Sequence, residues 1–210
     1  MFILPKECIF PPVSQSDEDG LLCIGGDLSV ERLMLAYRNG IFPWYNEDEP
    51  ILWYSPDPRF VLHPEELKVS KSMKSLIGKH EWTFTVNQDF VQTIRQCRFT
   101  KRKGQTGTWI HDDMEEAYLR LHEAGYATSA ECWRDGELIG GLYGIEFDRV
   151  FCGESMFSIE KNASKFAFIH FVKYLMGKGI QLIDCQVHTA HLESLGARLM
   201  TRESFLTYLT

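Results

Sequence analysis

The sequence predicts an α+β protein in two parts, a small loop-rich N-terminal domain over residues 1–60 and a larger mixed-sheet domain over residues 61–210. Three observations lead to this prediction. The first sixty residues are rich in proline, glycine and aromatic residues, as in GIFPWY (40–45) and SPDPR (55–59). After residue 60 the pattern changes to regular alternation of apolar and polar residues. Strand and helix patterns then mix along the chain, which favours one sheet covered by helices.

The composition is that of an ordinary folded protein. Of its 210 residues, 44% are apolar and 24% are charged, which excludes disordered, collagen-like and disulfide-scaffold classes. No stretch reaches 18 uncharged apolar residues, so we expect no membrane span. The N-terminus lacks the basic segment and the long apolar run of a signal peptide. The six cysteines are dispersed without a C-x-x-C pattern, so we expect buried thiols in a reducing cytoplasm.

One amphipathic helix is expected in the N-terminal domain, where Ser29 can cap its start and Gly40 can end it. Its apolar positions are Leu33, Met34, Ala36 and Tyr37. In the larger domain, Trp82–Val86 alternates like a strand. Two helical patterns follow, one through Phe90, Val91, Ile94 and Cys97, and one over Asp112–His122 that stops at Gly125.

A hairpin is the clearest feature of the second half. Its strands, Thr128–Trp133 and Glu137–Ile145, flank the turn dipeptide Asp135-Gly136. A further strand is expected over Val150–Gly153. Asn162 can then cap a long apolar helix that ends near Gly177 and Gly179. The remaining expected elements are a strand over Ile180–Cys185 and short helices over His191–Leu195 and Glu203–Leu209.

This order of elements is that of the N-acetyltransferase-like fold, which binds an acylated carrier where two central strands splay apart. The glycines that usually bind the pyrophosphate of coenzyme A are missing, because the turn before the long helix reads SIEKNASKF. The pair Gly140-Gly141 lies within an expected strand and lacks the spacing of a phosphate-binding loop.

Charge is distributed unevenly along the chain, whose net charge is −7. Residues 59–103 hold ten Lys and Arg against four acids, a net charge of +6, and the rest carries −13. A basic stretch on an acidic body would bind a polyanion at one place. A solvated surface without a partner is an equally good interpretation.

Two acids lie in apolar surroundings, Glu154 in FCGESMF and Asp184 in LIDCQV. Strand alternation would place Asp184 and Gln186 on one face, where they could orient an amine and relay a proton. The alternative is a structural acid with hydrogen-bond partners at a strand end.

Other motifs are weaker. Cys185, His188 and His191 form C-x-x-H-x-x-H, but a metal site or a nucleophilic pair needs a further ligand or orienting group. We therefore expect a packed Cys185 and no metal. Trp109 follows the basic run KRKGQTG and could stack on a nucleotide base, or it could be a core residue.

Taken together, the motifs resemble a known family. They are GGDLS (25–29), YRNGIFPWY (37–45), ILWYSPDPR (51–59), VSKSMK (69–74), GTWI (107–110), AYLRLHEAGYATSAECW (117–133), LIGGLYG (138–144), FCGESMFS (151–158), NASK (162–165), LIDCQV (182–187) and SLGA (194–197). In order and spacing they resemble the leucyl/phenylalanyl-tRNA–protein transferases from about residue 21 to the end.

The resemblance implies transfer of Leu, Phe or Met from aminoacyl-tRNA to proteins that begin with Arg or Lys, which marks them for the N-degron pathway. It implies a small N-terminal domain on an N-acetyltransferase-like domain, with tRNA as the carrier and no cofactor. We expect a cytoplasmic monomer that does not bind membranes. An acyl-CoA-dependent N-acyltransferase and a non-catalytic RNA-binding module are the alternatives.

Residue roles follow from the same resemblance. It implies that Glu154 holds the α-ammonium group of the donor and that Asp184 and Gln186 serve the acceptor and proton transfer. Trp109 would stack on the terminal adenine. The donor side-chain pocket would be lined by Leu142, Phe151, Met156, Phe168 and Phe171. The tRNA backbone would follow the basic stretch that contains Lys68, Lys71, Lys74, Lys101, Arg102 and Lys103.

Overall fold

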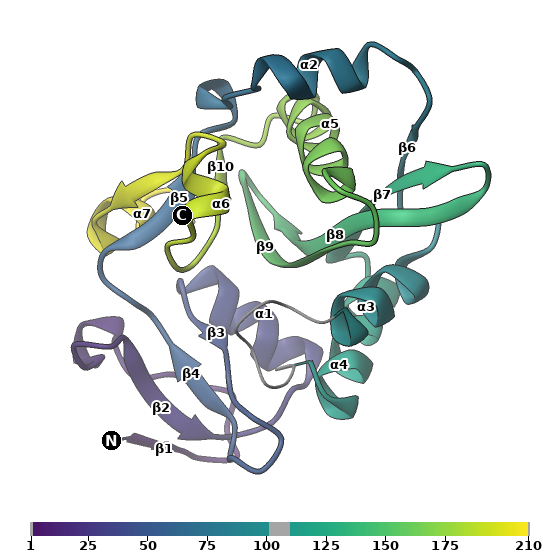
Figure 1. The fold of residues 1–210 in the computed structure, drawn as a ribbon. Coiled ribbons are helices and arrows are strands. Elements are labelled where there is room, and N and C mark those ends of the chain that lie inside the picture. The colour runs from purple at the N-terminus through teal and green to yellow at the C-terminus, as the bar shows by residue number, and fades with distance from the viewer. Residues whose placement is uncertain (1, 101–109, 210) are drawn as a thin grey trace.

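The N-terminal part of the chain is built on a four-stranded sheet with the order β1-β2-β4-β3 (Figure 1). The computed structural model describes residues 2–100 and 110–209. The strands are β1 (Phe2–Leu4), β2 (Leu21–Gly25), β3 (Phe42–Pro43) and β4 (Leu52–Tyr54). Helix α1 (Val30–Arg38) begins as predicted, because the hydroxyl of Ser29 accepts a hydrogen bond from the backbone N–H of Arg32 at 3.3 Å.

The rest of the chain forms a seven-stranded mixed sheet with the order β11-β5-β10-β9-β8-β7-β6. Its strands are β5 (Arg59–Leu62), β6 (Thr83–Val86), β7 (Ala127–Arg134), β8 (Glu137–Phe147), β9 (Val150–Ser158), β10 (Leu182–Asp184) and β11 (Arg198–Met200). The hairpin around Asp135-Gly136 is confirmed. The sequence patterns did not predict β5 and β11, which are short strands paired with each other.

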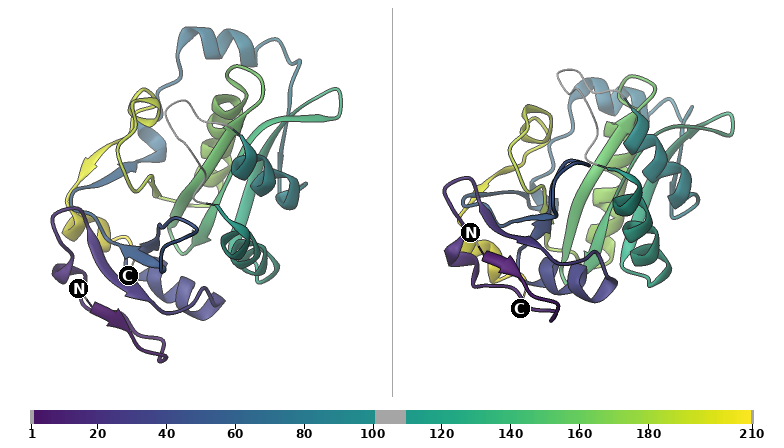
Figure 2. Two further views of the ribbon diagram at one scale, coloured as in Figure 1. Left: turned by 60° about the horizontal axis from the view of Figure 1, so that its bottom comes forward. Right: turned by 90° about the horizontal axis from the view of Figure 1, so that it is seen from below.

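Helices cover both faces of the large sheet (Figures 1 and 2). Helix α5 packs on one face, and α3 and α4 pack on the other, where α4 also contacts α1. The bounds are α2 (Lys71–Ile77), α3 (Phe90–Phe99), α4 (Asp112–Glu123), α5 (Ala163–Gly177), α6 (Ala190–Glu193) and α7 (Arg202–Leu206), with short 3-10 turns at Val13–Gln15 and Pro64–Glu66. The α+β class with an N-acetyltransferase-like order of elements is therefore confirmed.

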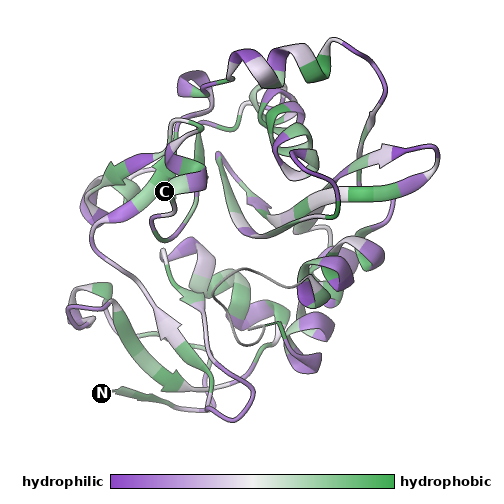
Figure 3. Ribbon diagram, in the orientation of Figure 1, coloured by the Kyte–Doolittle hydropathy of each residue, from purple (hydrophilic) through white to green (hydrophobic). Residues whose placement is uncertain are grey.

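Buried apolar residues form two cores, one on each face of this sheet. Figure 3 shows hydrophobic residues, in green, along β2 and within α5. The core on the face covered by α3 and α4 is continuous from Leu33 and Trp53 of the N-terminal part to Tyr118 and Tyr143 of the larger part. Because one core joins the two parts, a domain boundary near residue 60 stays a prediction. The other core is formed by α5 and the sheet.

The start of α5 differs from the sequence prediction in one respect. The helix begins where Asn162 predicts it, but the Asn162 side chain makes no capping hydrogen bond, because the residue adopts the left-handed conformation (φ 74°). The Ser158 hydroxyl instead accepts from the N–H of Ser164 at 3.1 Å. The helix start lies so close to β8 that a Cβ on Gly140 would come within 2.5 Å of Ala163 Cβ. Packing thus accounts for Gly140.

Two features of β9 create the site. Strand β9 pairs with β10 in parallel, and this pairing ends at Asp184 opposite Cys152, although β9 continues to Ser158. The two central strands therefore splay apart beyond this point. On its other side, β9 contains a β-bulge with Glu154 as the extra residue, since Tyr143 pairs with Ser155 and Gly144 with Gly153.

Candidate active site

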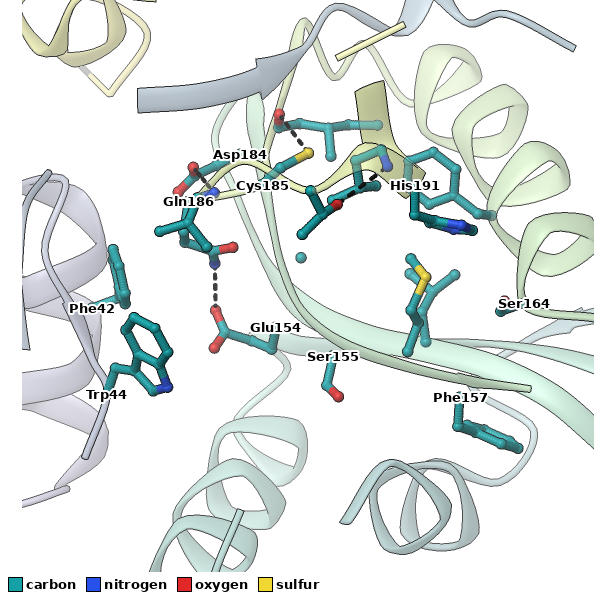
Figure 4. Close-up of a pocket in the computed structure, with 18 of the residues that line it drawn as sticks. Phe42, Trp44, Glu154, Ser155, Phe157, Ser164, Asp184, Cys185, Gln186 and His191 are labelled. Atoms are coloured by element: carbon teal, nitrogen blue, oxygen red, sulfur yellow. Dashed lines mark hydrogen bonds between the residues drawn. The ribbon is translucent and has the colours of Figure 1, made fainter. Parts of the chain in front are cut away.

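A cavity of about 540 Å³ lies where β9 and β10 separate (Figure 4). This volume is within the usual range for small-molecule sites. Its walls come from β3 and the residue after it, from the residue after α3, from β8 and β9, from the first half of α5, and from the segment 183–192 that runs into α6. The lining residues are Phe42, Pro43, Trp44, Thr100, Leu142, Gly153, Glu154, Ser155, Met156, Phe157, Ser158, Ser164, Phe168, Ile183, Asp184, Cys185, Gln186, Val187, Thr189, His191 and Leu192.

Three of the five residues predicted to form a side-chain pocket line this cavity, namely Leu142, Met156 and Phe168. The other two, Phe151 and Phe171, are not among its lining residues. They are fully buried behind it, with their ring centroids 4.9 Å apart in an edge-on arrangement. The bulge in β9 explains part of this geometry, because it reverses the alternation between Phe151 and Met156 and turns both toward the core under α5.

Glu154 is held at the polar end of the cavity by two hydrogen bonds. The Tyr118 hydroxyl donates to Oε2 at 2.7 Å, and the Gln186 amide donates to Oε1 at 3.2 Å. The Tyr118 hydroxyl also lies 2.6 Å from the hydroxyl of Tyr37 in α1. Burial raises the pKa of Glu154 to about 7, and the charge of Asp184 adds to this, while Tyr118, Tyr37 and Arg59 act in the opposite direction. Glu154 can therefore exchange a proton near neutral pH.

Asp184 has a different environment from Glu154. It is fully buried, and its two carboxylate oxygens accept hydrogen bonds from Nε and Nη2 of Arg59 at 2.8 and 2.7 Å. Oδ1 also accepts from the backbone N–H of Gln186 at 2.9 Å. The expected alternation of Asp184 and Gln186 on one strand face does not hold, because β10 ends at Asp184 and Gln186 has a φ of 55°. The Asp184 carboxylate thus faces Arg59, and the Gln186 side chain faces Glu154.

The C-x-x-H-x-x-H motif does not form a cluster. Cys185 is buried beside the cavity, and burial raises the pKa of its thiol. His188 lies 3.0 Å from Glu193 and packs edge-on against the ring of Phe60. Over residues 2–100 and 110–209, no group of three or more His, Cys, Asp or Glu side chains is placed to hold a metal ion.

The basic stretch 59–103 is not one uniform surface. Lys68, Lys71 and Lys74 are exposed on or next to α2. Arg59 is buried, and Arg98 is paired with Asp112 and Glu115 of α4. The other residues predicted to meet tRNA, namely Trp109, Lys101, Arg102 and Lys103, lie outside the described residues.

Sequence reasoning missed five residues of the site. Phe42 and Trp44 reach the cavity from the N-terminal part, and 43% of Trp44 is exposed. Tyr37, Tyr118 and Arg59 hold the two acids. Trp44 could have been found as an aromatic residue in a turn-rich segment, whereas Arg59 lies 125 residues from Asp184 along the chain and gave no local signal.

Comparison with known proteins decides which family this site belongs to. The model of the family described as "Leucyl/phenylalanyl-tRNA protein transferase" matches residues 61–210, and the model of its N-terminal domain matches residues 26–57. The chain belongs to this family. It is thus an aminoacyltransferase, as the resemblance of its motifs predicted.

Relatives with the name leucyl/phenylalanyl-tRNA–protein transferase match the full chain. The protein of Flavobacterium johnsoniae is 54% identical over 209 residues, covering 100% of this chain and 99% of its own. That of Syntrophobacter fumaroxidans is 54% identical over 209 residues, covering 100% of this chain and 89% of its own. That of Christiangramia forsetii is 54% identical over 210 residues, with 99% of each chain covered.

Solved structures resemble the transferase more distantly. The L-PGS of Bacillus licheniformis aligns with a TM-score of 0.45 and 13% identity, over 80% of this chain and 53% of its own. Among the described residues of the transferase, no helix is long and apolar enough to cross a membrane.

Proposed function

We propose that this transferase moves Leu, Phe or Met from aminoacyl-tRNA to the N-terminal α-amino group of proteins that begin with Arg or Lys. The extended N-terminus would then mark these proteins for an N-degron pathway. One observation carries the proposal: an apolar cavity leads directly to a polar pair, Glu154 and Gln186, at the splay of β9 and β10. We propose that it acts as a monomer.

The apolar part of the cavity suits the donor side chain. Leu142, Met156, Phe168 and Ile183 offer a surface without charge, on which Leu, Phe and Met gain free energy by leaving water. One methylene group changes the binding free energy of a side chain in an apolar pocket by only about 1–3 kcal/mol. Discrimination against other apolar side chains therefore has to come from the shape of the pocket. We expect side chains branched at Cβ to fit poorly.

The reaction is the attack of an amine on an ester. The nitrogen of the acceptor bonds to the ester carbonyl carbon, the bond from that carbon to the ribose oxygen breaks, and the ribose hydroxyl leaves. One proton must pass from the amine to the leaving oxygen. Holding both reactants in line can lower the barrier by about 7–11 kcal/mol. Glu154, with a pKa of about 7, is suited to take up this proton and return it.

The tRNA would meet the enzyme through charge and stacking. Lys68, Lys71 and Lys74 reach the surface and can contact phosphates, which position a nucleic acid without reading its sequence. The exposed ring of Trp44 at the cavity offers a stacking surface for a base, worth about 1–3 kcal/mol. Trp109 and the basic run 101–103 keep their proposed roles in tRNA binding.

The acceptor is proposed to bind by electrostatic attraction. An N-terminal Arg or Lys carries two positive charges, and the chain outside residues 59–103 has a net charge of −13. Two acids line the cavity, and Glu154 is the one that is not paired with Arg59.

A single assay tests the proposal. Radiolabelled Phe-tRNA is mixed with the enzyme and with a peptide that begins with Arg, and a matched peptide that begins with Ala is the control. We expect label in the Arg peptide and little in the Ala peptide. Equal transfer to both peptides would refute the acceptor choice. Transfer from acyl-CoA, with none from Phe-tRNA, would favour the acyl-CoA-dependent alternative.

A further inference from the structure

A second basic segment lies in the part of the chain that is acidic as a whole. Residues 159–181 hold four lysines and one acid, and α5 within them contains no acid at all. At the start of the helix, Lys161 is exposed and Lys165 is half-buried. Over residues 2–100 and 110–209, Lys178 at the far end of α5 is the only lysine in a salt bridge, with Glu146. Lys161 and Lys165 therefore carry positive charge that no acid of the described chain neutralises.

Lys165 lies next to the cavity. It precedes Phe168, which lines the cavity, by three residues, and residues three apart on a helix are neighbours on its surface. It is also close to His191, another lining residue: burial lowers the pKa of the His191 imidazole, and the charge of Lys165 lowers it further. Figure 4 shows His191 on the α5 side of the cavity, away from Glu154 and Gln186. Lys165 thus lies near the end of the cavity that is remote from the polar pair.

The positive charge continues from α5 to α2 by way of α6. Lys68 lies next to the end of α6, because its backbone N–H donates to the oxygen of Leu195 at 2.8 Å. Lys165 is close to His191 of the same helix. Helix α2, which carries two exposed lysines, packs on α5, and Figure 1 shows it, in blue, above that helix. We call these residues the lysine surface, and they are Lys68, Lys71, Lys74, Lys161 and Lys165.

The acids that border the lysine surface do not neutralise it. The 3-10 turn at Pro64–Glu66, helix α6 and the turn before α5 together hold four acids. Three of them are bound to other side chains, in the pairs Glu66–Arg198, Glu160–Arg134 and Glu193–His188. The fourth, Glu65, is exposed and makes no salt bridge within the described chain. Such an excess of positive charge attracts a polyanion, whereas it repels an acceptor that begins with Arg or Lys.

We propose that the tRNA strand next to the aminoacylated end leaves the cavity over the start of α5, where Lys165 contacts one of its phosphates, and continues along Lys68 toward α2. The inference rests on the proposed function, which supplies tRNA as the polyanion. Phosphate contacts position a nucleic acid without reading its sequence. Lys165 would therefore hold the ester in the cavity in the same way for every donor tRNA.

The test compares a donor that has phosphates with a donor that has none. The first is Phe-tRNA and the second is 3′-O-phenylalanyl-adenosine, each with an Arg peptide as acceptor. In Lys165→Glu we expect the KM for Phe-tRNA to rise by about tenfold or more, because a cation that binds phosphate becomes an anion. The KM for 3′-O-phenylalanyl-adenosine should stay within about twofold, because the cavity itself is intact. The control Lys178→Glu makes the same charge change at the other end of α5 and should leave both KM values unchanged.

A direct binding measurement checks the electrostatic part. The Kd for tRNA without an amino acid is measured between about 50 and 200 mM salt for wild type and both variants. The slope of the logarithm of the binding constant against the logarithm of the salt concentration should fall by about one in Lys165→Glu and stay unchanged in Lys178→Glu. An unchanged slope in Lys165→Glu, or an equal fall in the control, would overturn the inference. An equal rise of KM for both donors would overturn it as well, since it would show a role inside the cavity.

Two milder variants cover the case in which Lys165→Glu does not fold. Lys165→Gln removes the charge and should raise the Kd for tRNA, whereas Lys165→Arg keeps the charge and should bind tRNA within about threefold of wild type. Equal losses in the two variants would contradict a phosphate contact. The proposed function is judged separately. If wild type transfers Phe from neither donor, that function fails, while a salt slope that depends on Lys165 would still support the lysine surface as a site for tRNA.

Discussion

Replacing Glu154 by Gln should change how the stability of the protein depends on pH. The raised pKa of Glu154 means that the folded protein holds this proton more tightly than the unfolded chain does. Below pH 4.5 the carboxyl group is protonated in both states and costs nothing. Between pH 4.5 and 7 only the unfolded chain releases the proton, so the free energy of unfolding falls as the pH rises.

The size of the effect follows from the two pKa values. The pKa rises from 4.5 in the unfolded chain to about 7 in the folded protein. Each pH unit between them is worth about 1.4 kcal/mol, so wild type loses at most about 3 kcal/mol by pH 8. This is an upper limit, because the cavity side of Glu154 is open to water. Gln at this position carries no charge at any pH and escapes the loss.

The assay is urea denaturation of wild type and Glu154→Gln at pH 5, 6, 7 and 8. Gln has one acceptor oxygen where Glu has two, so either the Gln186 amide or the Tyr118 hydroxyl loses its acceptor, a cost of about 1–3 kcal/mol that does not change with pH. We therefore compare the difference between the two proteins across the series, and expect the variant to gain relative to wild type as the pH rises. A difference that is the same at pH 5 and pH 8 would refute the reasoning. Glu116→Gln, an exposed acid of α4, is the control.

Three further predictions concern the support of the site and the approach of tRNA. Tyr118→Phe removes the hydroxyl that favours the charged form of Glu154, so the ascending limb of the pH–rate profile should move to higher pH; an unmoved limb would contradict this. Gly144→Ala places a Cβ 2.1 Å from the backbone oxygen of Cys152 and should lower the free energy of unfolding, measured by urea denaturation, by about 3 kcal/mol. The control Gly177→Ala has open space around its Cβ and should not lower it. Equal effects of the two variants would be evidence against the packing argument. Charge reversal of Lys68, Lys71 and Lys74, on or beside α2, should make tRNA binding less dependent on salt. The slope of the logarithm of the binding constant against the logarithm of the salt concentration should fall by about one for each phosphate that is no longer neutralised. An unchanged slope would place the tRNA elsewhere.

The elements that the sequence predicted correctly are those with strong local signals. The helix capped by Ser29 and the hairpin around Asp135-Gly136 depend on residues next to one another in the chain. The strand β5 was missed because four residues, all buried, show no alternation. Asn162 was expected to cap α5, and the helix does begin directly after it. The residue adopts the left-handed conformation, however, and its side chain makes no capping hydrogen bond, so the predicted start was right but its reason was wrong.

The five residues predicted for a side-chain pocket fall at different depths for a similar reason. The resemblance of motifs selected five apolar residues, and three of them line the cavity. Phe151 and Phe171 are as apolar as the others, and residue type cannot separate a cavity wall from the layer behind it. The bulge at Glu154 brings Met156 to the face that Phe151 already occupies, so the depth of burial, and not the strand face, separates the two residues.

From the sequence alone came the fold class, the family and the residue types of the site, because periodicity, turn residues and motifs are local properties that survive in a one-dimensional string. Only the tertiary structure decided what each acid does. Glu154 and Asp184 look alike as carboxylates in apolar segments, but one meets Tyr118 and Gln186 at a cavity, and the other meets a buried Arg59. Charge and burial depend on neighbours brought together by folding, and Arg59 becomes the partner of Asp184 only when β5 pairs with β10.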